Sequence, residues 1–274
     1  MPEKKPPPGK YLLRYRLAAP SWVIPGSLNE NCRFLASKVD EVGLLFLESE
    51  ACLQYGPEDL PASLADLPLS YHVHLPVDLP MRDGPATAAA ICYALLKKTA
   101  FLAEAGSVIQ GEKMPHLRAV LHPPVEDPAQ PGKAAEQLDT FVRVFADMGG
   151  EPSLLLLENI RGNNLLRHFD LLRKYRMSIC LDLGHALAFG QDDLLEENSL
   201  PGLLGMVHLS APGSGSSADR HMPLTTLNRE ESAKGARLCA TLPHGKVIML
   251  ELFDWTQVRD SLPLLLSWLG AVSK

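Results

Sequence analysis

Histidine and carboxylate residues recur along this sequence at the ends of short apolar runs. Six successive runs end in such a residue, namely His74, His122, Glu158, Asp182, His208 and Glu251. Imidazole mixed with carboxylate suits zinc, manganese or iron, and carboxylates packed together repel one another unless cations hold them. The pattern therefore predicts a divalent metal site, with zinc as the expected ion and manganese or iron as alternatives.

A second set of candidate ligands accompanies the first. His185 follows Asp182 by three positions in "DLGHA", and Asp219 and His221 stand two apart in the segment "SAPGSGSSADRHMPL". Asp182 and His185 are too close along the chain to serve one ion easily. We therefore expect His185, Asp219 and His221 to form a separate metal site, so that one D-x-x-H turn supplies two neighbouring ions.

The apolar runs alternate with segments typical of helices. The expected strands cover residues 17–24, 42–48, 69–75, 117–122, 153–159, 177–183, 205–210 and 246–252. The expected helices cover residues 27–38, 58–66, 86–105, 132–148, 164–174, 191–197, 228–241 and 256–270. Uniformly apolar strands that each precede a helix must be covered on both faces, which indicates a parallel sheet.

Eight such units in about 250 residues predict an α/β fold, a single closed (β/α)₈ TIM barrel. An open doubly wound sheet is the alternative, but the first strand is followed by no G-x-G-x-x-G motif for a dinucleotide. Chemistry in a TIM barrel sits at the C-terminal mouth of the strands. We therefore place the metal cluster at that mouth and take Glu158, Asp182 and Glu251 as the candidate catalytic residues.

Composition limits the domain count and the class of partner. The chain has 274 residues, of which 46% are hydrophobic, and this length suits one barrel over residues 11–274 after a tail over residues 1–10. The formal net charge of −6 gives no basic field to attract phosphate backbones, which makes nucleic acid an unlikely partner. The oligomeric state stays open.

Five dispersed cysteines without a C-x-x-C pair indicate reduced thiols and a cytoplasmic location. Neither an apolar signal segment nor a run near the roughly 18 apolar residues that span a bilayer is evident, so we expect no membrane span.

These motifs, in this order along the chain, resemble the xylose-isomerase-like barrel superfamily and, within it, the endonuclease IV type of apurinic-site endonuclease (AP endonuclease family 2). The resemblance rests on "VHLP", "LHPP", "LENI", "DLGHA", "VHLS", "DRH" and "LEL". It implies a centre of up to three zinc ions with Glu158 as the bridge. The implied ligand sets are His74, His122 and Glu158; Glu158, Asp182, His208 and Glu251; and His185, Asp219 and His221.

The number of ions bears on the reaction. Metals about 3.5 to 4 Å apart suit phosphodiester hydrolysis, because together they hold the phosphate and stabilise the leaving oxygen. The alternative is a sugar or sugar-phosphate isomerase or epimerase, which by resemblance uses only Glu158, Asp182, His208 and Glu251 around one metal. A corrinoid- or sugar-binding barrel without catalysis is a third hypothesis, but it has no need of three ions.

The first loop favours a cofactor-sized substrate. "SWVIPGSLNENCRF" offers Trp22 and only one basic residue, Arg33, which leaves abasic DNA as a lesser alternative. The segments "SWVIPGSLNENCRFLASKVDEVGLLFLES" and "LSYHVHLPVDLP" resemble the cobamide-remodelling phosphodiesterases (CbiR). That resemblance implies hydrolysis of the phosphoester in the nucleotide loop of a corrinoid cofactor.

Four further residues are candidates for supporting roles. Trp22, Glu48 and Arg161 are the weaker candidates for substrate binding, because each lies in a loop expected at the mouth. His72 lies two residues before His74, on the same face but deeper, so we expect it to pack beneath the cluster or orient a ligand.

Overall fold

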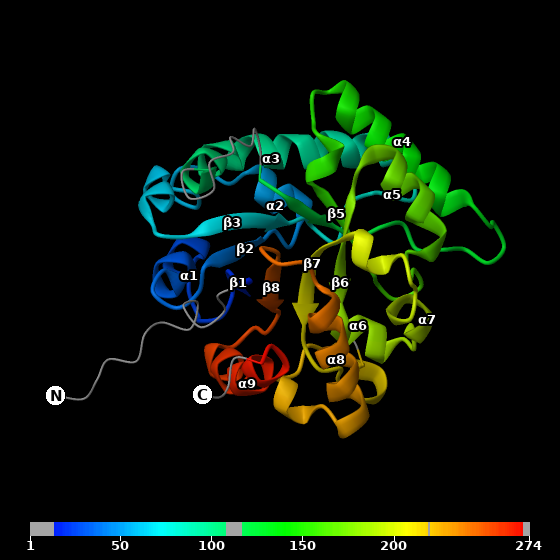
Figure 1. The fold of residues 1–274 in the computed structure, drawn as a ribbon. Coiled ribbons are helices and arrows are strands. Elements are labelled where there is room, and N and C mark those ends of the chain that lie inside the picture. Colours follow the sequence, from blue (N-terminus) through cyan, green and yellow to red (C-terminus); the bar gives the residue numbers. More distant parts are fainter. Residues whose placement is uncertain (1–13, 108–116, 219, 271–274) are drawn as a thin grey trace.

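The computed structural model describes residues 14–107, 117–218 and 220–270, so the expected tail over residues 1–10 lies outside the described residues. Eight parallel strands pair in chain order and close into a barrel, which confirms the TIM-barrel prediction (Figure 1). The strands are β1 (Arg16–Pro20), β2 (Glu41–Leu45), β3 (Ser70–His74), β4 (Ala119–Leu121), β5 (Leu155–Glu158), β6 (Ser178–Asp182), β7 (Leu204–Leu209) and β8 (Val247–Leu250).

Helices surround the barrel and follow the strands along the chain (Figure 1). They are α1 (Leu28–Leu35), α2 (Ser49–Leu53), α3 (Pro85–Ser107), α4 (Lys133–Asp147), α5 (Phe169–Tyr175), α6 (Leu183–Ala188), α7 (Asp192–Leu195), α8 (Arg229–Thr241) and α9 (Trp255–Trp268). Short 3₁₀ turns are η2 (Ala62–Asp66), η3 (Pro152–Leu154), η4 (Leu166–His168), η5 (Leu200–Gly202), η6 (Gly215–Ser217) and η7 (Leu224–Thr226).

Two helical predictions need correction. The helix expected over residues 58–66 is only the 3₁₀ turn Ala62–Asp66, because Pro61 holds the extended conformation immediately before it. The unexpected α6 begins inside the run expected as strand 177–183. It starts there because the Asp182 side chain caps it by accepting the backbone N–H of His185.

Polar side chains fix where three further helices begin. Ser27 and Glu30 form a reciprocal capping box at α1, and Asn228 and Glu231 form another at α8. Asp254 accepts two backbone N–H groups at the start of α9. Because these caps lie at the loops that follow β1, β7 and β8, they also fix the loops at the mouth of the barrel.

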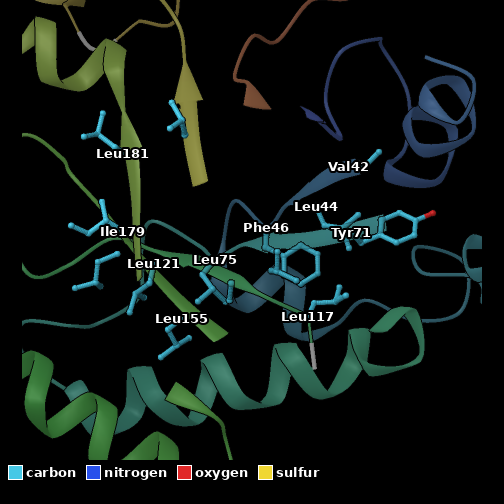
Figure 2. Packing of buried hydrophobic residues seen from close by; sticks show 14 of the residues in the cluster. Val42, Leu44, Phe46, Tyr71, Leu75, Leu117, Leu121, Leu155, Ile179 and Leu181 are labelled. Carbon is cyan, nitrogen blue, oxygen red and sulfur yellow. The ribbon is translucent and has the colours of Figure 1, made fainter. Parts of the chain in front are cut away.

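Alternation along the strands divides the interior into two cores. Outward residues such as Leu155, Ile179 and Leu181 join the large cluster between barrel and helices, where Figure 2 shows their side chains. A smaller cluster fills the barrel itself, namely Ala18, Val120, Leu156, Cys180, Met206, Val247 and Met249. On each ligand-bearing strand, the candidate ligand lies two residues after a residue that faces the barrel interior. Because side chains alternate along a strand, the candidate also faces the barrel axis.

Helix α3 is the one described helix long and apolar enough to span a membrane, over residues Pro85–Ala103. Its composition reflects packing inside the fold, because 44% of that segment is buried and the helix lies against α4 and β3. The helix expected over residues 86–105 agrees with α3.

Candidate metal centre

The six strand-end candidates meet at the C-terminal mouth of the barrel. His74, Glu158 and Asp182 are the last residues of β3, β5 and β6, and His208 lies near the end of β7. His122 and Glu251 directly follow β4 and β8. Except for the partly exposed His122, all of them are buried.

Four of these residues form a compact group around Glu158. The ligand atoms of His74, Glu158, His208 and Glu251 all lie within 4.8 Å of one another, and we call these residues the Glu158 group. Glu158 Oε2 lies 3.0 Å from His74 Nε2, and its Oε1 lies 2.9 Å from His208 Nδ1. His122 Nε2 approaches the same carboxylate, 2.9 Å from Oε2. Glu158 therefore bridges three imidazoles.

A second group lies beside the first. Asp182, His185 and His221 also place ligand atoms within 4.8 Å of one another, and we call them the Asp182 group. Asp182 and His185, which we expected to serve separate ions, therefore lie in one group, because α6 begins directly after Asp182. His221 Nε2 lies 3.9 Å from Asp182 Oδ2 and 3.3 Å from Glu251 Oε2, so it links the two groups. Asp219, the remaining predicted ligand, lies outside the described residues.

Backbone carbonyls hold two of the histidine rings in a defined tautomer. His74 donates Nδ1–H to the carbonyl of Leu75 at 3.1 Å, and His185 donates Nδ1–H to the carbonyl of Asn159 at 2.9 Å. Each ring consequently presents Nε2 to the centre. This arrangement is typical of metal-ligating histidines, whose second nitrogen is usually bound by a neighbouring acceptor.

Asn159 and Gly184 position the Asp182 group, although no sequence pattern predicted a role for either residue. The buried Asn159 side chain accepts the N–H of Asp182 at 2.7 Å and donates to its carbonyl at 2.9 Å, which ties the ends of β5 and β6 together. A Cβ atom at residue 184 would collide with the Ser210 hydroxyl. Glycine therefore permits α6 to start directly after Asp182 and to carry His185 over the mouth.

The carboxylates have opposite pKa shifts. Burial alone would raise the pKa of Glu158, but the charge of His208 and the hydrogen bonds from His122, His208 and His74 hold it well below its ordinary 4.5. The pKa of Glu251 is also held well below 4.5, because the attraction of His208 and His221 is stronger than the opposing effects of burial and of the Glu158 charge. Burial dominates at Asp182 and, with the charge of Glu251, raises its pKa to about 6.

The histidines of the centre bind protons tightly when no cation is present. Burial alone would lower the pKa of His221, but Glu251 and Asp182 raise it to about 9. The carboxylates also raise the pKa values of His74 and His185, against the opposing effect of burial. The pKa of His208 is raised against burial by Cys180 together with Glu251 and Glu158. A cation at this centre therefore has to displace these protons before it binds.

The residues fit a divalent metal. Asp182 Oδ2, His221 Nε2 and Glu251 Oε2 are buried and make no hydrogen bond within the described ranges, although they face one another. Buried atoms of this kind are normally satisfied, so an ion is the physical explanation for this convergence. The mixture of imidazole nitrogen and carboxylate oxygen suits zinc, manganese or iron.

The three weaker candidates for substrate binding lie around the mouth but outside both groups. Trp22 follows β1 with 54% of its surface exposed. Glu48 is exposed after β2, at the start of α2. Arg161 is exposed beyond β5, where its guanidinium lies 5.9 Å from the centre of the Phe189 ring.

A buried polar group beneath the centre includes His72, as expected, and Glu41, which was not among the predicted residues. His72 Nδ1 lies 2.7 Å from Glu41 Oε1, and both residues are fully buried. Arg16 and Arg118 lie 2.7 Å and 3.2 Å from the Glu41 carboxylate. The only available sequence signal was that Glu41, Gly43 and Leu45 alternate with apolar residues that face outward.

No family model and no curated protein matches this chain. Solved structures do match, at low sequence identity. A D-tagatose 3-epimerase-like protein is 18% identical with a TM-score of 0.67, over 94% of this chain and 98% of its own. The IOLI protein with a bound zinc atom is 12% identical with a TM-score of 0.62, over 94% and 98%.

A xylose isomerase-like TIM barrel protein from Mycobacterium smegmatis in complex with magnesium is 11% identical, with a TM-score of 0.57, over 94% of this chain and 98% of its own. Several other matching structures are described as sugar epimerases. None of the three compared in detail is described as an endonuclease or a corrinoid enzyme. These likenesses show that the chain shares the TIM-barrel fold of these proteins.

Proposed function

We propose that this protein is a metal-dependent phosphodiesterase whose centre holds more than one divalent ion. The observation that carries the proposal is the Asp182 group, a second set of ligands linked through His221 to the Glu158 group. A single ion held by Glu158, Asp182, His208 and Glu251 would leave His185 and His221 without a purpose as ligands. Phosphodiester hydrolysis uses neighbouring ions, since both the attacking and the leaving oxygen need stabilisation.

The side chains divide the work in this proposal. The Glu158 group with His122 would hold one part of the cluster, and the Asp182 group would hold the other. The ions, when bound, supply Lewis acidity and a water of lowered pKa. Glu158, Glu251 and Asp182 provide the negative charge that retains the ions, and their burial keeps bulk water from weakening that attraction. Arg161, which is exposed in the loop after β5, would attract the phosphate charge.

A sugar isomerase or epimerase with a single metal is the second candidate, and the solved structures favour it. The D-tagatose 3-epimerase-like protein has the highest TM-score of those compared above, and several further matches are described as epimerases. Glu158, Asp182, His208 and Glu251 would suffice for that chemistry. The two candidates differ in whether His185 and His221 are needed.

A variant that lacks His185 and His221 separates the two candidates. We expect the His185→Ala, His221→Ala protein to lose one bound ion per chain and about 10²-fold in cleavage of bis(4-nitrophenyl) phosphate, since one ion contributes several kcal/mol to such a transition state. Elemental analysis of protein purified without chelators gives the ion count. His244→Ala, which removes an exposed imidazole at the opposite end of the barrel, is the matched control.

The opposite result would support the epimerase. A single ion that survives the double change, together with unaltered epimerisation of a ketose such as D-tagatose and no diester cleavage, contradicts the phosphodiesterase proposal.

The mouth carries five of the six large hydrophobic side chains that are exposed in the described residues, and we call these five the apolar rim. It comprises residues in the loops after β1, β2, β3, β4 and β8, namely Trp22, Leu47, Val77, Val125 and Phe253. Met148, after α4, is the only other large hydrophobic residue exposed in the described part of the chain. Clustered exposed apolar residues mark binding surfaces. Together with the resemblance to cobamide-remodelling enzymes, the rim supports a corrinoid as the substrate.

Truncation of the rim tests the size of the substrate. We expect Trp22→Ala and Phe253→Ala each to raise KM for a cobamide about 10-fold or more, because burial of one large apolar side chain contributes about 1.5–3 kcal/mol. The KM for bis(4-nitrophenyl) phosphate, a far smaller substrate, should rise less. Met148→Ala is the control for an exposed apolar residue away from the mouth. An equal rise in KM for both substrates would argue against a rim that binds the corrinoid.

A further inference from the structure

His208 faces the metal centre with the opposite ring nitrogen from His74 and His185. It presents Nδ1, which lies 2.9 Å from Glu158 Oε1 and 3.0 Å from Glu251 Oε2. Its Nε2 is buried without a hydrogen-bond partner among the residues described, and the buried Cys180 thiol also interacts with the ring. The tautomer that leaves Nδ1 free for a cation carries its proton on Nε2 and therefore needs an acceptor there.

His72 carries a second buried nitrogen without a partner. The rings of His72 and His208 have centroids 6.3 Å apart and planes tilted by 35°, and both residues are fully buried. His72 donates Nδ1–H to Glu41 Oε1 at 2.7 Å, which leaves Nε2 as an unpaired acceptor. One buried water between two neighbouring rings satisfies a donor on one and an acceptor on the other.

The surroundings fix His72 in this state. The Glu41 carboxylate is held by Arg16 at 2.7 Å, Arg118 at 3.2 Å and the Ser70 hydroxyl at 2.9 Å. This carboxylate therefore remains an acceptor for His72 Nδ1–H. Gly43 leaves space for the ring, since a Cβ atom there would lie 2.8 Å from His72 Nε2.

We propose that Glu41 and His72 are positioning residues for the metal centre. His208 donates Nε2–H through one buried water to His72 Nε2, and this contact keeps the Nδ1 lone pair directed at the Glu158 group. Glu41 sets the tautomer of His72, and His72 sets that of His208. The inference rests on the proposed metal-dependent function.

Zinc affinity tests the proposal without reference to turnover. Competition against a chromophoric chelator should show His72→Phe binding Zn²⁺ 10- to 100-fold more weakly than the parent, the usual effect of removing such an outer contact. His72→Gln keeps a polar acceptor and should recover much of the loss. Met206→Leu, a change of another buried residue inside the barrel, is the control and should bind as the parent does.

The absorption spectrum of the Co²⁺-substituted protein gives an independent readout, since it reports the ligand field at His208. We expect the d–d bands to change in His72→Phe and to remain as in the parent in Met206→Leu. Glu41→Gln, expected to weaken Zn²⁺ binding in the same direction, serves if His72→Phe does not fold.

Parent-like affinity and an unchanged Co²⁺ spectrum in a folded His72→Phe protein would overturn this inference and leave the metal-dependent function intact. A parent that binds no Zn²⁺ would instead overturn the proposed function itself.

Discussion

The Asp182→Asn and Glu251→Gln variants should lose bound metal and at least about 10³-fold in turnover. Each change replaces a charged ligand by a neutral amide of the same shape, at a centre whose ions stabilise the transition state by several kcal/mol. Their folds should persist. The pKa of Asp182 is raised to about 6 by burial and by Glu251, so its charge destabilises the metal-free protein. Metal-free Asp182→Asn should consequently unfold at a temperature no lower than the metal-free parent.

Elemental analysis, turnover and thermal unfolding of both proteins check this prediction. Asp147→Asn, a change of the same kind at an exposed residue at the end of α4, is the matched control and should leave metal content and turnover unaltered. Full turnover in both variants would remove these carboxylates from the metal centre.

Metal removal should leave a protein whose stability falls steeply with rising pH. The raised pKa of His221 means that its stabilising contribution is complete below its ordinary value of 6.5 and disappears as the pH rises through about 9. That one shift corresponds to about 3 kcal/mol. His74, His185 and His208 shift in the same direction and add to the loss.

The carboxylates act on the acid side. Glu158 and Glu251 stabilise the fold above their ordinary pKa of 4.5 and lose that contribution only well below it. Asp182 opposes them, since its stability contribution falls as the pH rises from 3.8 to about 6. The metal-free protein should therefore be most stable between about pH 4.5 and 6.5.

Urea unfolding at pH 6, 7.5 and 9, with and without chelator, measures this dependence. Bound cations take the place of the protons, so the metal-loaded protein should lose far less free energy of unfolding between pH 6 and 9. Parallel pH profiles for loaded and metal-free protein would show that the histidines are not at a metal centre.

The barrel could be predicted from sequence because its strands are short apolar runs whose alternation is regular. Leu155 and Leu157 face outward on β5 while Leu156 and Glu158 face inward, and the same two-residue period operates on the other ligand-bearing strands. Once that period is known, residues at the ends of neighbouring strands have to converge.

The missed features lack such a period. Helices α2 and α6 contain only five and six residues, too few for an amphipathic pattern. The Asp182 side chain caps α6, whereas the first N–H of α2 is accepted by Asp78, 29 residues away. The roles of Asn159 and Glu41 depend on contacts with residues distant in sequence, such as the bond from Asn159 to Asp182 across 23 residues. A single sequence contains no signal for these contacts.

The bridging position of Glu158 also has a consequence for the order of folding. Its contacts with His74 and His208 join residues 84 and 50 positions apart, and Glu251 is added only when the last strand pairs with the first. Closure of such long loops is slow and comes late in folding. A partly synthesised or partly folded chain would therefore offer no complete cation site, and metal uptake would report that the barrel has closed.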